Sequence, residues 1–348
     1  MKVVQIGCGS AASLHRQAFP PEVEIIAVVD TDPQKVELAK REGFPAFSSI
    51  LLVPQKFKSH VDFWDVCVPN EEHLPVMREL LHMGATKILV EKPICVPSQI
   101  KEMKKLLDNF PEAQVCVEET YLSSTVVEKV REKAKKYQLI SPHIIVEKSK
   151  NRINDVLDGR FLDPELGVFG LETPHSVASV IGTGIGRAPS KLQFCWTKSM
   201  DLPSGHLLPR QGSGSISYLT KDGCQVKLLT SMDGNIIYPL PEINAPTFIP
   251  QGDPTRYRII VLEEGGFKII GQFEPIPGRE RFMGRVLVYQ NSQLLEEATF
   301  EDKPMNRQLA RAIRYFQGQG DNPGHPDDAL AIVSFLGEVM EEIKKSKK

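Results

Sequence analysis

Short apolar runs alternate with amphipathic stretches over the first 120 residues of the chain. The apolar runs predict strands, and the stretches whose apolar side chains recur every three or four residues predict helices. The expected strands are 3–6, 24–30, 61–69, 87–93 and 113–119, and the expected helices are 11–18, 33–43, 72–84 and 97–110. Strands that alternate with helices in this way are typical of βαβ units, so this half predicts a parallel sheet covered by helices on both faces.

The pattern changes after a helix expected at 125–136. From there on, short strands follow one another, at 143–150, 191–198, 215–220, 224–231, 257–264, 266–273, 285–290 and 293–300. Three turns between them have residues typical of β-hairpins: 221–223, 264–266 and 291–292. We therefore expect an open, mainly antiparallel sheet, long surface loops over the proline-rich segment 239–254, and one long amphipathic helix at 327–345.

Composition narrows the class of protein. The chain has 348 residues, enough for two domains with separate cores. Its 42 Lys and Arg and 44 Asp and Glu give a net charge of −2, which favours neither nucleic acid nor an anionic membrane as a partner. The six cysteines lie far apart and form no CxxC pair, which argues against a disulfide scaffold or a zinc ribbon. We expect a cytoplasmic protein that acts on a small molecule.

The first expected strand runs directly into a GxGxxA motif and then into a helix. Gly7 allows the tight turn, Gly9 lets the backbone approach a pyrophosphate, and Ala12 permits close helix packing. Asp30 ends the second strand, where a carboxylate accepts from the ribose hydroxyls of NAD and repels the 2′-phosphate of NADP. We therefore expect an NAD site, with NADP less favoured, formed by Gly7, Gly9, Ser10, Ala11, Ala12 and Asp30.

Two further segments follow the next strands. Val68-Pro69-Asn70-Glu71-Glu72-His73 ends one strand and opens a helix, and Val90-Glu91-Lys92-Pro93 ends the next strand. Together with the glycine motif, they resemble the Gfo/Idh/MocA oxidoreductase family, whose members include glucose–fructose oxidoreductase and inositol dehydrogenase. The resemblance covers about residues 1–120 and returns at Pro326-Asp327-Asp328-Ala329-Leu330, where the final helix begins.

The resemblance implies an α/β protein with two domains. A dinucleotide-binding Rossmann domain is expected at 1–122, and a substrate-binding domain with an open, mainly antiparallel sheet at 123–348. The final helix is free to pack back on the first domain, and the sheet usually packs against another subunit to give homodimers or homotetramers. The further residues expected to contact the cofactor are Pro69, Asn70, His73, Glu91 and Lys92.

Lys92 is the expected catalytic residue of the first domain. It would lie at the carboxyl edge of the parallel sheet, where ligands of such folds bind. A lysine there can hydrogen-bond the reacting hydroxyl and stabilise the alkoxide. Glu91 would tune its charge, and Pro93 would fix the bend, through a peptide bond that in this family is often cis.

The second catalytic element is expected at Gly167–Ser176. The family typically places Asp and His four residues apart on one helix face, whereas here Leu171 stands four residues before His175 and the carboxylate is Glu172. Residues three apart also share a helix face, so Glu172 and His175 can still converge. His175 is the expected general base, because imidazole titrates near neutral pH, and Glu172 is its expected catalytic or substrate-binding partner.

Further substrate contacts are expected from the polar residues that flank these motifs. Glu119 and Tyr121 follow the last parallel strand, and Lys148, Arg152 and Asn154 follow the first strand of the second sheet. Arginine and lysine there would suit a phosphate or carboxylate and asparagine would suit hydroxyls, although a charged surface loop explains the same residues equally well. The remaining histidines have no ligand spacing, so we expect no metal site.

These features favour an NAD-dependent dehydrogenase or reductase that acts on CH–OH groups. It would interconvert a secondary alcohol and a ketone on a sugar, sugar derivative or cyclitol, and the unusual motifs suggest amino-sugar or aminocyclitol biosynthesis. Two alternatives stay open: a non-catalytic NAD-binding sensor or subunit, and a reductase of an imine or tetrapyrrole-like substrate on the same fold.

Overall fold

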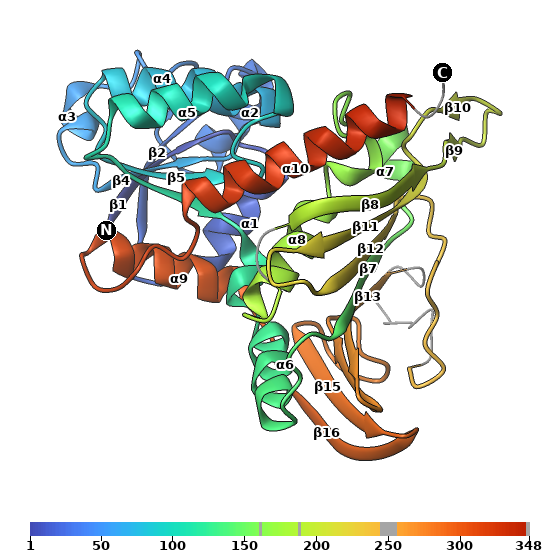
Figure 1. Ribbon diagram of the computed structural model, residues 1–348. Coiled ribbons are helices and arrows are strands. Elements are labelled where there is room, and N and C mark those ends of the chain that lie inside the picture. The colour runs from blue at the N-terminus through green and yellow to red at the C-terminus, as the bar shows by residue number, and fades with distance from the viewer. Residues whose placement is uncertain (160–161, 187–188, 244–255, 346–348) are drawn as a thin grey trace. The chain divides into compact units, whose positions relative to one another are not determined.

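The computed structural model describes residues 1–159, 162–186, 189–243 and 256–345 (Figure 1). The chain forms two compact units. The first comprises Met1–Thr120 and Met305–Val333, and the second comprises Tyr121–Pro304 and Ser334–Lys348. The sequence placed one boundary after residue 122, whereas the contacts also group residues 305–333 with the first unit.

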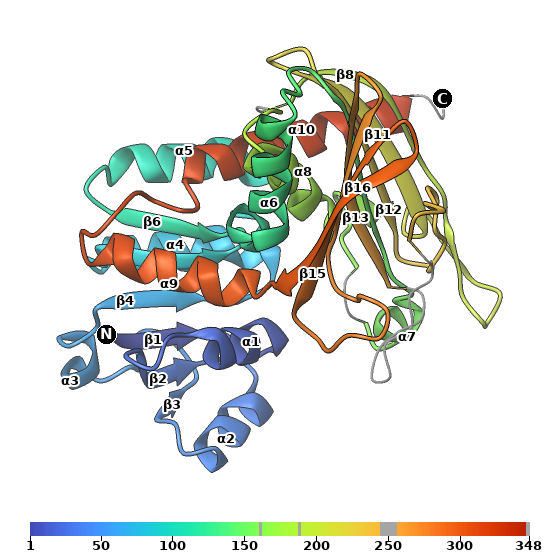
Figure 2. The ribbon, with the colours of Figure 1, turned by 90° about the horizontal axis from the view of Figure 1, so that it is seen from below.

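The first unit is built on a six-stranded parallel sheet. Its strands are β1 (Lys2–Ile6), β2 (Glu24–Val29), β3 (Ala46–Phe47), β4 (Phe63–Val66), β5 (Lys87–Glu91) and β6 (Gln114–Glu118). Its helices are α1 (Ser10–Ala18), α2 (Pro33–Arg41), α3 (Gln55–Lys58), α4 (His73–His82), α5 (Ile100–Asn109) and α9 (Pro304–Phe316), with short 3₁₀ turns η1 (Asn70–Glu72) and η2 (Pro97–Gln99). The strand order is β3-β2-β1-β4-β5-β6, so β2 and β3 lie on one side of β1 and β4, β5 and β6 lie on the other (Figure 2). This is the doubly wound arrangement that binds dinucleotides.

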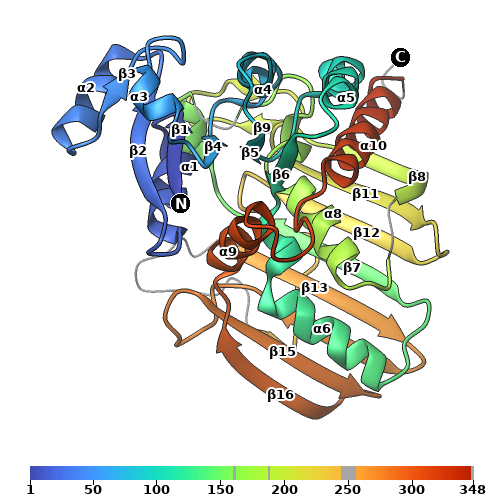
Figure 3. The ribbon, with the colours of Figure 1, turned by 90° about the vertical axis from the view of Figure 1, so that its left-hand side faces the viewer.

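Alternate strand residues of the first unit pack against helices on opposite faces of the sheet. Val4 and Ile6 belong to the cluster with α4 and α5, whereas Val3 packs with α1 and α9. Figure 3 shows α4 and α5 on one side of β5 and β6 and α9 on the other. Burial on both faces explains the continuously apolar strands and confirms the predicted parallel α/β sheet.

The second unit is built on an eight-stranded sheet. Its strands are β7 (His143–Ser149), β8 (Pro189–Thr197), β11 (Ser213–Thr220), β12 (Gln225–Ser231), β13 (Tyr257–Glu264), β14 (Phe267–Gln272), β15 (Met283–Gln290) and β16 (Gln293–Glu301). A short ribbon adds β9 (Met200–Asp201) and β10 (Leu207–Leu208). The helices and 3₁₀ turns are η3 (Thr120–Ser123), α6 (Thr125–Lys136), α7 (Ile153–Leu157), η4 (Gly167–Phe169) and α8 (Thr173–Gly182). The last helix, α10 (Pro326–Lys345), contributes residues to both units.

The large sheet is mainly antiparallel, as predicted, and its order is β16-β15-β14-β13-β7-β12-β11-β8. The three predicted hairpins are present as β11–β12, β13–β14 and β15–β16. One pair departs from the pattern, because β7 and β12 run parallel. Helices α6 and α8 lie across one face of the sheet (Figure 3).

The structure shows two features that the sequence analysis did not predict. Helix α9 was not predicted, although Leu309, Ala312, Ile313 and Phe316 form a buried stripe along it at helical spacing. The proline-rich segment was expected to be surface loop, but Leu240 and Ile243 are buried against the open side of the large sheet. They pack on apolar side chains of β7, β12 and β13, so hydrophobic burial fixes this part, while residues 244–254 lie outside the described residues.

Within the described ranges, none of the helices has the length and apolarity that a membrane crossing needs.

Two buried tyrosines of the second unit predict opposite effects of the same substitution. The Tyr218 hydroxyl is buried and has no hydrogen-bond partner among the described residues, whereas the Tyr257 hydroxyl accepts from Leu240 N and donates to Tyr238 O. An unpaired buried hydroxyl costs free energy, and a paired one stabilises the fold. We expect Tyr218→Phe to raise the free energy of unfolding by about 1 kcal/mol and Tyr257→Phe to lower it by about 1 kcal/mol, measured by urea titration. Equal losses in both variants would contradict this explanation.

Candidate functional site

The glycine motif forms a tight turn between β1 and α1. Gly7 has a φ of +97°, and a Cβ atom there would lie 2.2 Å from Cys67 O, so no other residue fits without moving the backbone. Gly9 is the N-cap of α1, and a Cβ atom on it would meet no described atom within 4 Å. Ser10 and Ala11 begin the helix, and Ala12 is fully buried. The turn leaves open space in front of a helix N-terminus, which suits a pyrophosphate.

Asp30 connects the end of β2 to this turn. Its Oδ2 accepts from Cys8 N at 2.8 Å, and its Oδ1 accepts from Asp32 N at 2.9 Å. Lys35 Nζ lies 3.8 Å from the same carboxylate. The carboxylate is thereby held beside the glycine turn, where a ribose hydroxyl would need an acceptor.

Lys92 follows the last residue of β5 and precedes Pro93 in a cis peptide bond. Its backbone N–H donates to Oε2 of Glu91 at 3.1 Å. Because β1, β2 and β5 are parallel, their carboxyl ends place Gly7, Asp30 and Lys92 at the same edge of one sheet. The three strongest candidates of the first unit therefore share one edge.

His73 corrects one expectation. It was predicted to contact the cofactor, but its side chain is fully buried, with Nδ1 2.7 Å from Pro93 O and Nε2 3.0 Å from Val68 O. Burial lowers its pKa. The ring therefore clamps together the two loops that carry the other candidates, Pro69 and Asn70 at the start of η1 and Lys92 beside Pro93.

A buried charge network lies directly behind Lys92. His15 of α1 is fully buried, with Nδ1 2.9 Å from Oδ1 of Asp65 on β4 and Nε2 3.1 Å from Oε1 of Glu91 on β5. Gln5 donates to the other Asp65 oxygen at 2.8 Å. Burial acts to lower the pKa of His15, but the charge of Asp65 holds it well above its usual range. A protonated imidazole therefore donates to two carboxylates, one of which also holds the Lys92 backbone.

The neighbours of His15 are residue types that can bind metal ions. The ligand atoms of His15, Asp65 and Cys67 lie within 4.8 Å of one another, as do those of His15, Glu91 and Glu118. Sequence spacing gave no sign of this group, because its five members come from α1, from β4 and the residue after it, from β5 and from β6. Both ring nitrogens of His15 face carboxylates, which is the geometry of a shared-proton network.

The first unit also buries Glu118 at the end of β6. Burial, followed by the charge of Glu91, raises the pKa of Glu118 to about 8. Thr120 Oγ1 lies 2.9 Å and 2.8 Å from its two carboxyl oxygens. Glu118 is thus largely protonated at neutral pH, which limits the negative charge near Glu91.

In the second unit, Tyr121 lies at the centre of the predicted substrate residues. Lys148 Nζ lies 2.9 Å from the centroid of its ring, a cation–π contact, and Arg258 Nη1 donates to its hydroxyl at 3.2 Å. Its ring also lies 5.0 Å from the rings of His175 and Phe273. The structure therefore brings Tyr121, Lys148 and His175 together, and adds Arg258, which the sequence analysis missed.

Glu172 is not placed as predicted. It is the N-cap of α8 rather than a residue inside the helix with His175, and one of its oxygens, Oε1, lies 2.9 Å from Arg152 Nη2 and 3.1 Å from Arg258 Nη2. Burial acts to raise its pKa, but Arg258 and then Arg152 hold that pKa well below its usual range. A carboxylate held this firmly in its charged form fits a fixed counterion between two arginines.

The remaining substrate candidates differ in their exposure. Glu119 is buried between β6 and η3, and Arg152 is partly buried beside Glu172. Asn154 is exposed on α7. The structure thus joins Arg152 to the Tyr121 group and places the Asn154 side chain in solvent.

Two sequence clues pointed to the missed residues. Asp65 interrupts the apolar run of β4, and Arg256 and Arg258 are two residues apart at the start of an apolar strand. Charged residues that share a face with buried apolar positions need a partner in the core. A charge inside an apolar run is therefore a sign of a buried network.

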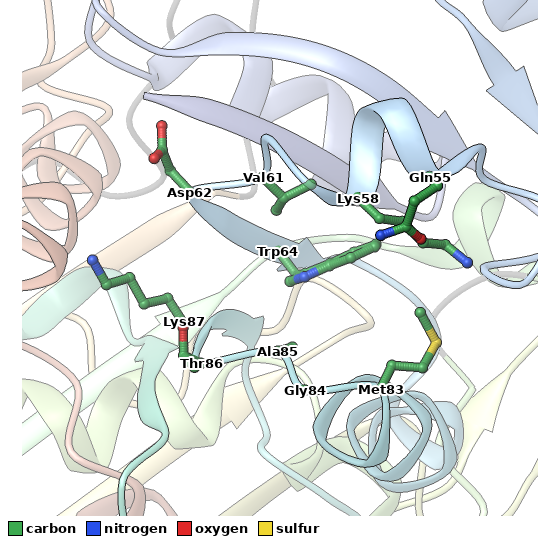
Figure 4. A pocket seen from close by; sticks show the side chains of 10 residues that line it. All are labelled: Gln55, Lys58, Val61, Asp62, Trp64, Met83, Gly84, Ala85, Thr86 and Lys87. Atoms are coloured by element: carbon green, nitrogen blue, oxygen red, sulfur yellow. The ribbon is translucent and has the colours of Figure 1, made fainter.

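A pocket of about 340 Å³ opens at the other edge of the parallel sheet (Figure 4). It is lined by residues that precede or begin β4 and β5, among them Asp62, Trp64 and Lys87. Strand polarity separates this amino edge from the carboxyl edge that carries the glycine turn. The pocket is therefore distinct from the predicted cofactor site.

Residues 1–121 match a family model, Gfo/Idh/MocA, described as an oxidoreductase family with an NAD-binding Rossmann fold. This match confirms the resemblance predicted from the glycine, VPNEEH and VEKP motifs. It also confirms NAD as the cofactor. No curated protein matches the chain.

Solved structures share the fold of the entire chain at low identity. An oxidoreductase from Desulfitobacterium hafniense, described as putatively NADPH-dependent, has a TM-score of 0.76 at 12% identity, over 99% of this chain and 96% of its own. The WlbA dehydrogenase from Bordetella pertussis, in complex with NADH and UDP-GlcNAcA, has a TM-score of 0.71 at 15% identity, over 99% and 97%. A putative myo-inositol dehydrogenase from Sinorhizobium meliloti has a TM-score of 0.70 at 13% identity, over 100% and 98%.

One prediction follows from Glu118. Its pKa is raised in the folded state, so the folded protein keeps a proton that the unfolded chain loses above its ordinary pKa of 4.5. Stability from this group is present below about pH 4.5 and is lost as the pH rises toward about 8. We expect Glu118→Gln to reduce the loss of unfolding free energy between pH 5 and 8 by about 2 kcal/mol, measured by urea titration at each pH. Glu102→Gln, in an exposed pair with Arg78, is the control, and identical pH slopes in both variants would contradict the assignment.

Proposed function

We propose that the protein interconverts a secondary alcohol and a ketone on a sugar, sugar derivative or cyclitol with NAD, because residues 1–121 match the model of the Gfo/Idh/MocA oxidoreductase family. The observation that carries the proposal is the shared edge of the parallel sheet, where Gly7, Asp30 and Lys92 follow β1, β2 and β5. A protein that only sensed NAD would have no use for an amine at that position. This favours an enzyme over a binding subunit.

The residues present fit the cofactor. The open space at Gly9 and the N-terminus of α1 suit the pyrophosphate, and the Asp30 carboxylate suits the ribose hydroxyls. When bound, NAD supplies the acceptor for a hydride. The side chains of this chain must then orient the alcohol and place its proton.

In the proposed reaction, Lys92 donates a hydrogen bond to the reacting oxygen and stabilises its developing negative charge. Glu91 holds the Lys92 backbone, and His15 holds Glu91. His175 of the second unit is the proposed proton acceptor, supported by its partly buried ring against Tyr121. Glu172 is assigned to positioning, since it stays charged between two arginines.

We also propose that the enzyme works in the cytoplasm as a homo-oligomer. All six cysteines are free thiols, which suits the reducing cytoplasm. The edge strands of the large sheet expose Phe194 of β8 and Leu294 and Leu295 of β16. These apolar side chains support a homodimer or homotetramer formed through that sheet.

The first test concerns the cofactor. Asp30→Ala removes the carboxylate that would accept from the ribose and repel a 2′-phosphate, so we expect the ratio of NADPH to NADH dissociation constants to fall about tenfold. Fluorescence titration with each reduced cofactor measures both constants. Asp32→Ala is the matched control, because the Asp32 side chain caps α2 by accepting from Gln34 N and the backbone N–H that donates to Asp30 is kept. An unchanged ratio in Asp30→Ala would remove Asp30 from the ribose site.

The second test concerns Lys92. Lys92→Met keeps the length of the side chain but removes the ammonium group, so we expect turnover of sugars and cyclitols to fall at least about a hundredfold while NADH affinity changes little. Lys87→Met is the control, since Lys87 begins the same strand and bonds Phe316 O at its opposite end. If Lys92→Met turned over substrate like the parent protein, Lys92 would have no part in the chemistry.

A further inference from the structure

The second unit places cations side by side on its large sheet. Lys148 on β7 is the register partner of Arg258 on β13 and of Thr230 on β12, so the three side chains point to the same face. We call these residues the polar row. Lys148 is fully buried, and the Arg258 side chain is 12% exposed. Like charges directly opposite each other on neighbouring strands are destabilising, so the fold retains this pair against a cost.

Further cations surround the row. Arg152 shares Oε1 of Glu172 with Arg258, and Arg256 precedes the first residue of β13, two residues from Arg258 along the strand direction. Burial and then the charge of Arg258 lower the pKa of Arg256. The carboxylates that pair with these groups are Glu172, Glu274 at 2.8 Å from Arg256, and Asp155 at 3.5 Å from Arg152. In the described part of the chain, these cations and carboxylates lie together in a largely buried setting.

The same region holds polar atoms whose bonding capacity is unused. Among the described residues, no hydrogen-bond partner exists for Arg256 Nε, Thr230 Oγ1 or Thr173 Oγ1, all of which are buried. Oε2 of Glu172 is also buried without one in the described part of the chain. Three of these four atoms, the arginine nitrogen and the two threonine hydroxyls, can donate a hydrogen bond. Buried donors of this kind normally have an acceptor. An oxyanion would accept from them and offset the charge of the row.

From this arrangement we propose that the second unit binds an anionic group of the substrate, a carboxylate or a phosphate, at the polar row together with Arg256 and Arg152. The inference rests on the proposed function, because it names the substrate class of that oxidoreductase as an acidic or phosphorylated sugar. Guanidinium groups suit such ligands, since they donate two parallel hydrogen bonds to two oxygens. Burial strengthens each contact, because the local dielectric is lower than that of water.

Arg256 offers the cleanest variant. Arg258 and Arg152 anchor Glu172, so their removal would leave a buried carboxylate unpaired, whereas Arg256 pairs with Glu274 alone among the ion pairs of the described residues. The double variant Arg256→Gln/Glu274→Gln removes both charges together and keeps the balance. Lys268→Gln/Glu242→Gln is the matched control, because it removes the ion pair between Lys268 of β14 and Glu242, away from the polar row. Lys268 Nζ also lies 3.4 Å from Glu263 Oε1 of β13.

The test compares ligands that differ in charge. The protein saturated with NADH is titrated with D-glucose, D-glucuronate and D-glucose 6-phosphate by calorimetry, and the two anions separate a carboxylate preference from a phosphate preference. We expect at least one anion to bind tenfold or more tightly than glucose. We expect that preference to fall about tenfold in Arg256→Gln/Glu274→Gln and to stay unchanged in the Lys268 control. Equal binding of all three sugars, no binding of any, or an unchanged preference in the Arg256 variant would each overturn the inference.

Two readouts keep this inference separate from the proposed function. Binding of NADH and oxidation of neutral sugars or cyclitols without any preference for the anions would leave the proposed function intact and overturn the inference. Charge-selective binding that depends on Arg256, with no ketone formed from any sugar or cyclitol in the presence of NAD, would support the anion site and overturn the proposed function.

Discussion

A single imidazole ties together the parts of the first unit on which the chemistry depends. His15 lies in the helix that follows the glycine turn, and its two nitrogens reach Asp65 on β4 and Glu91 on β5. Glu91 in turn holds the backbone of Lys92. The position of the amine is therefore linked to the helix that would receive the pyrophosphate. Breaking one partner of such a buried pair leaves an uncompensated charge, so the network holds these elements to one geometry.

The second unit inverts this charge arrangement. One carboxylate, Glu172, lies between Arg152 and Arg258, where the first unit places one protonated histidine between two carboxylates. In both places burial opposes the charged form and the neighbouring charges outweigh burial. The result is the same in each unit: a central group whose protonation state does not change near neutral pH, which orients its neighbours without exchanging protons.

The sequence was informative wherever local pattern and local chemistry coincide. The parallel strands, the three hairpins and the turn at Gly7 follow from periodicity and from residues with special backbone freedom, and they were predicted correctly. Helix α9 was missed although its apolar spacing was present. The partners of His15 and Glu172 come from elements far apart in the chain, so spacing carried no trace of them. The parallel pair β7–β12 likewise depends on tertiary packing.

The polar residues that the sequence analysis singled out fall into two groups, one fully buried and one partly exposed. His73 and Glu172 look like ligand-binding groups in the sequence, yet both are buried and engaged by the protein itself. Lys92 and His175 are only partly buried, so their reactive atoms can also form hydrogen bonds with groups outside the protein. Desolvation explains this division, because a buried polar group without a partner costs free energy, whereas a partly exposed one can still bond to water or to a substrate. Partial burial of a titratable side chain beside a fully satisfied neighbour is thus the feature that separates the groups proposed to react from those that hold them in place.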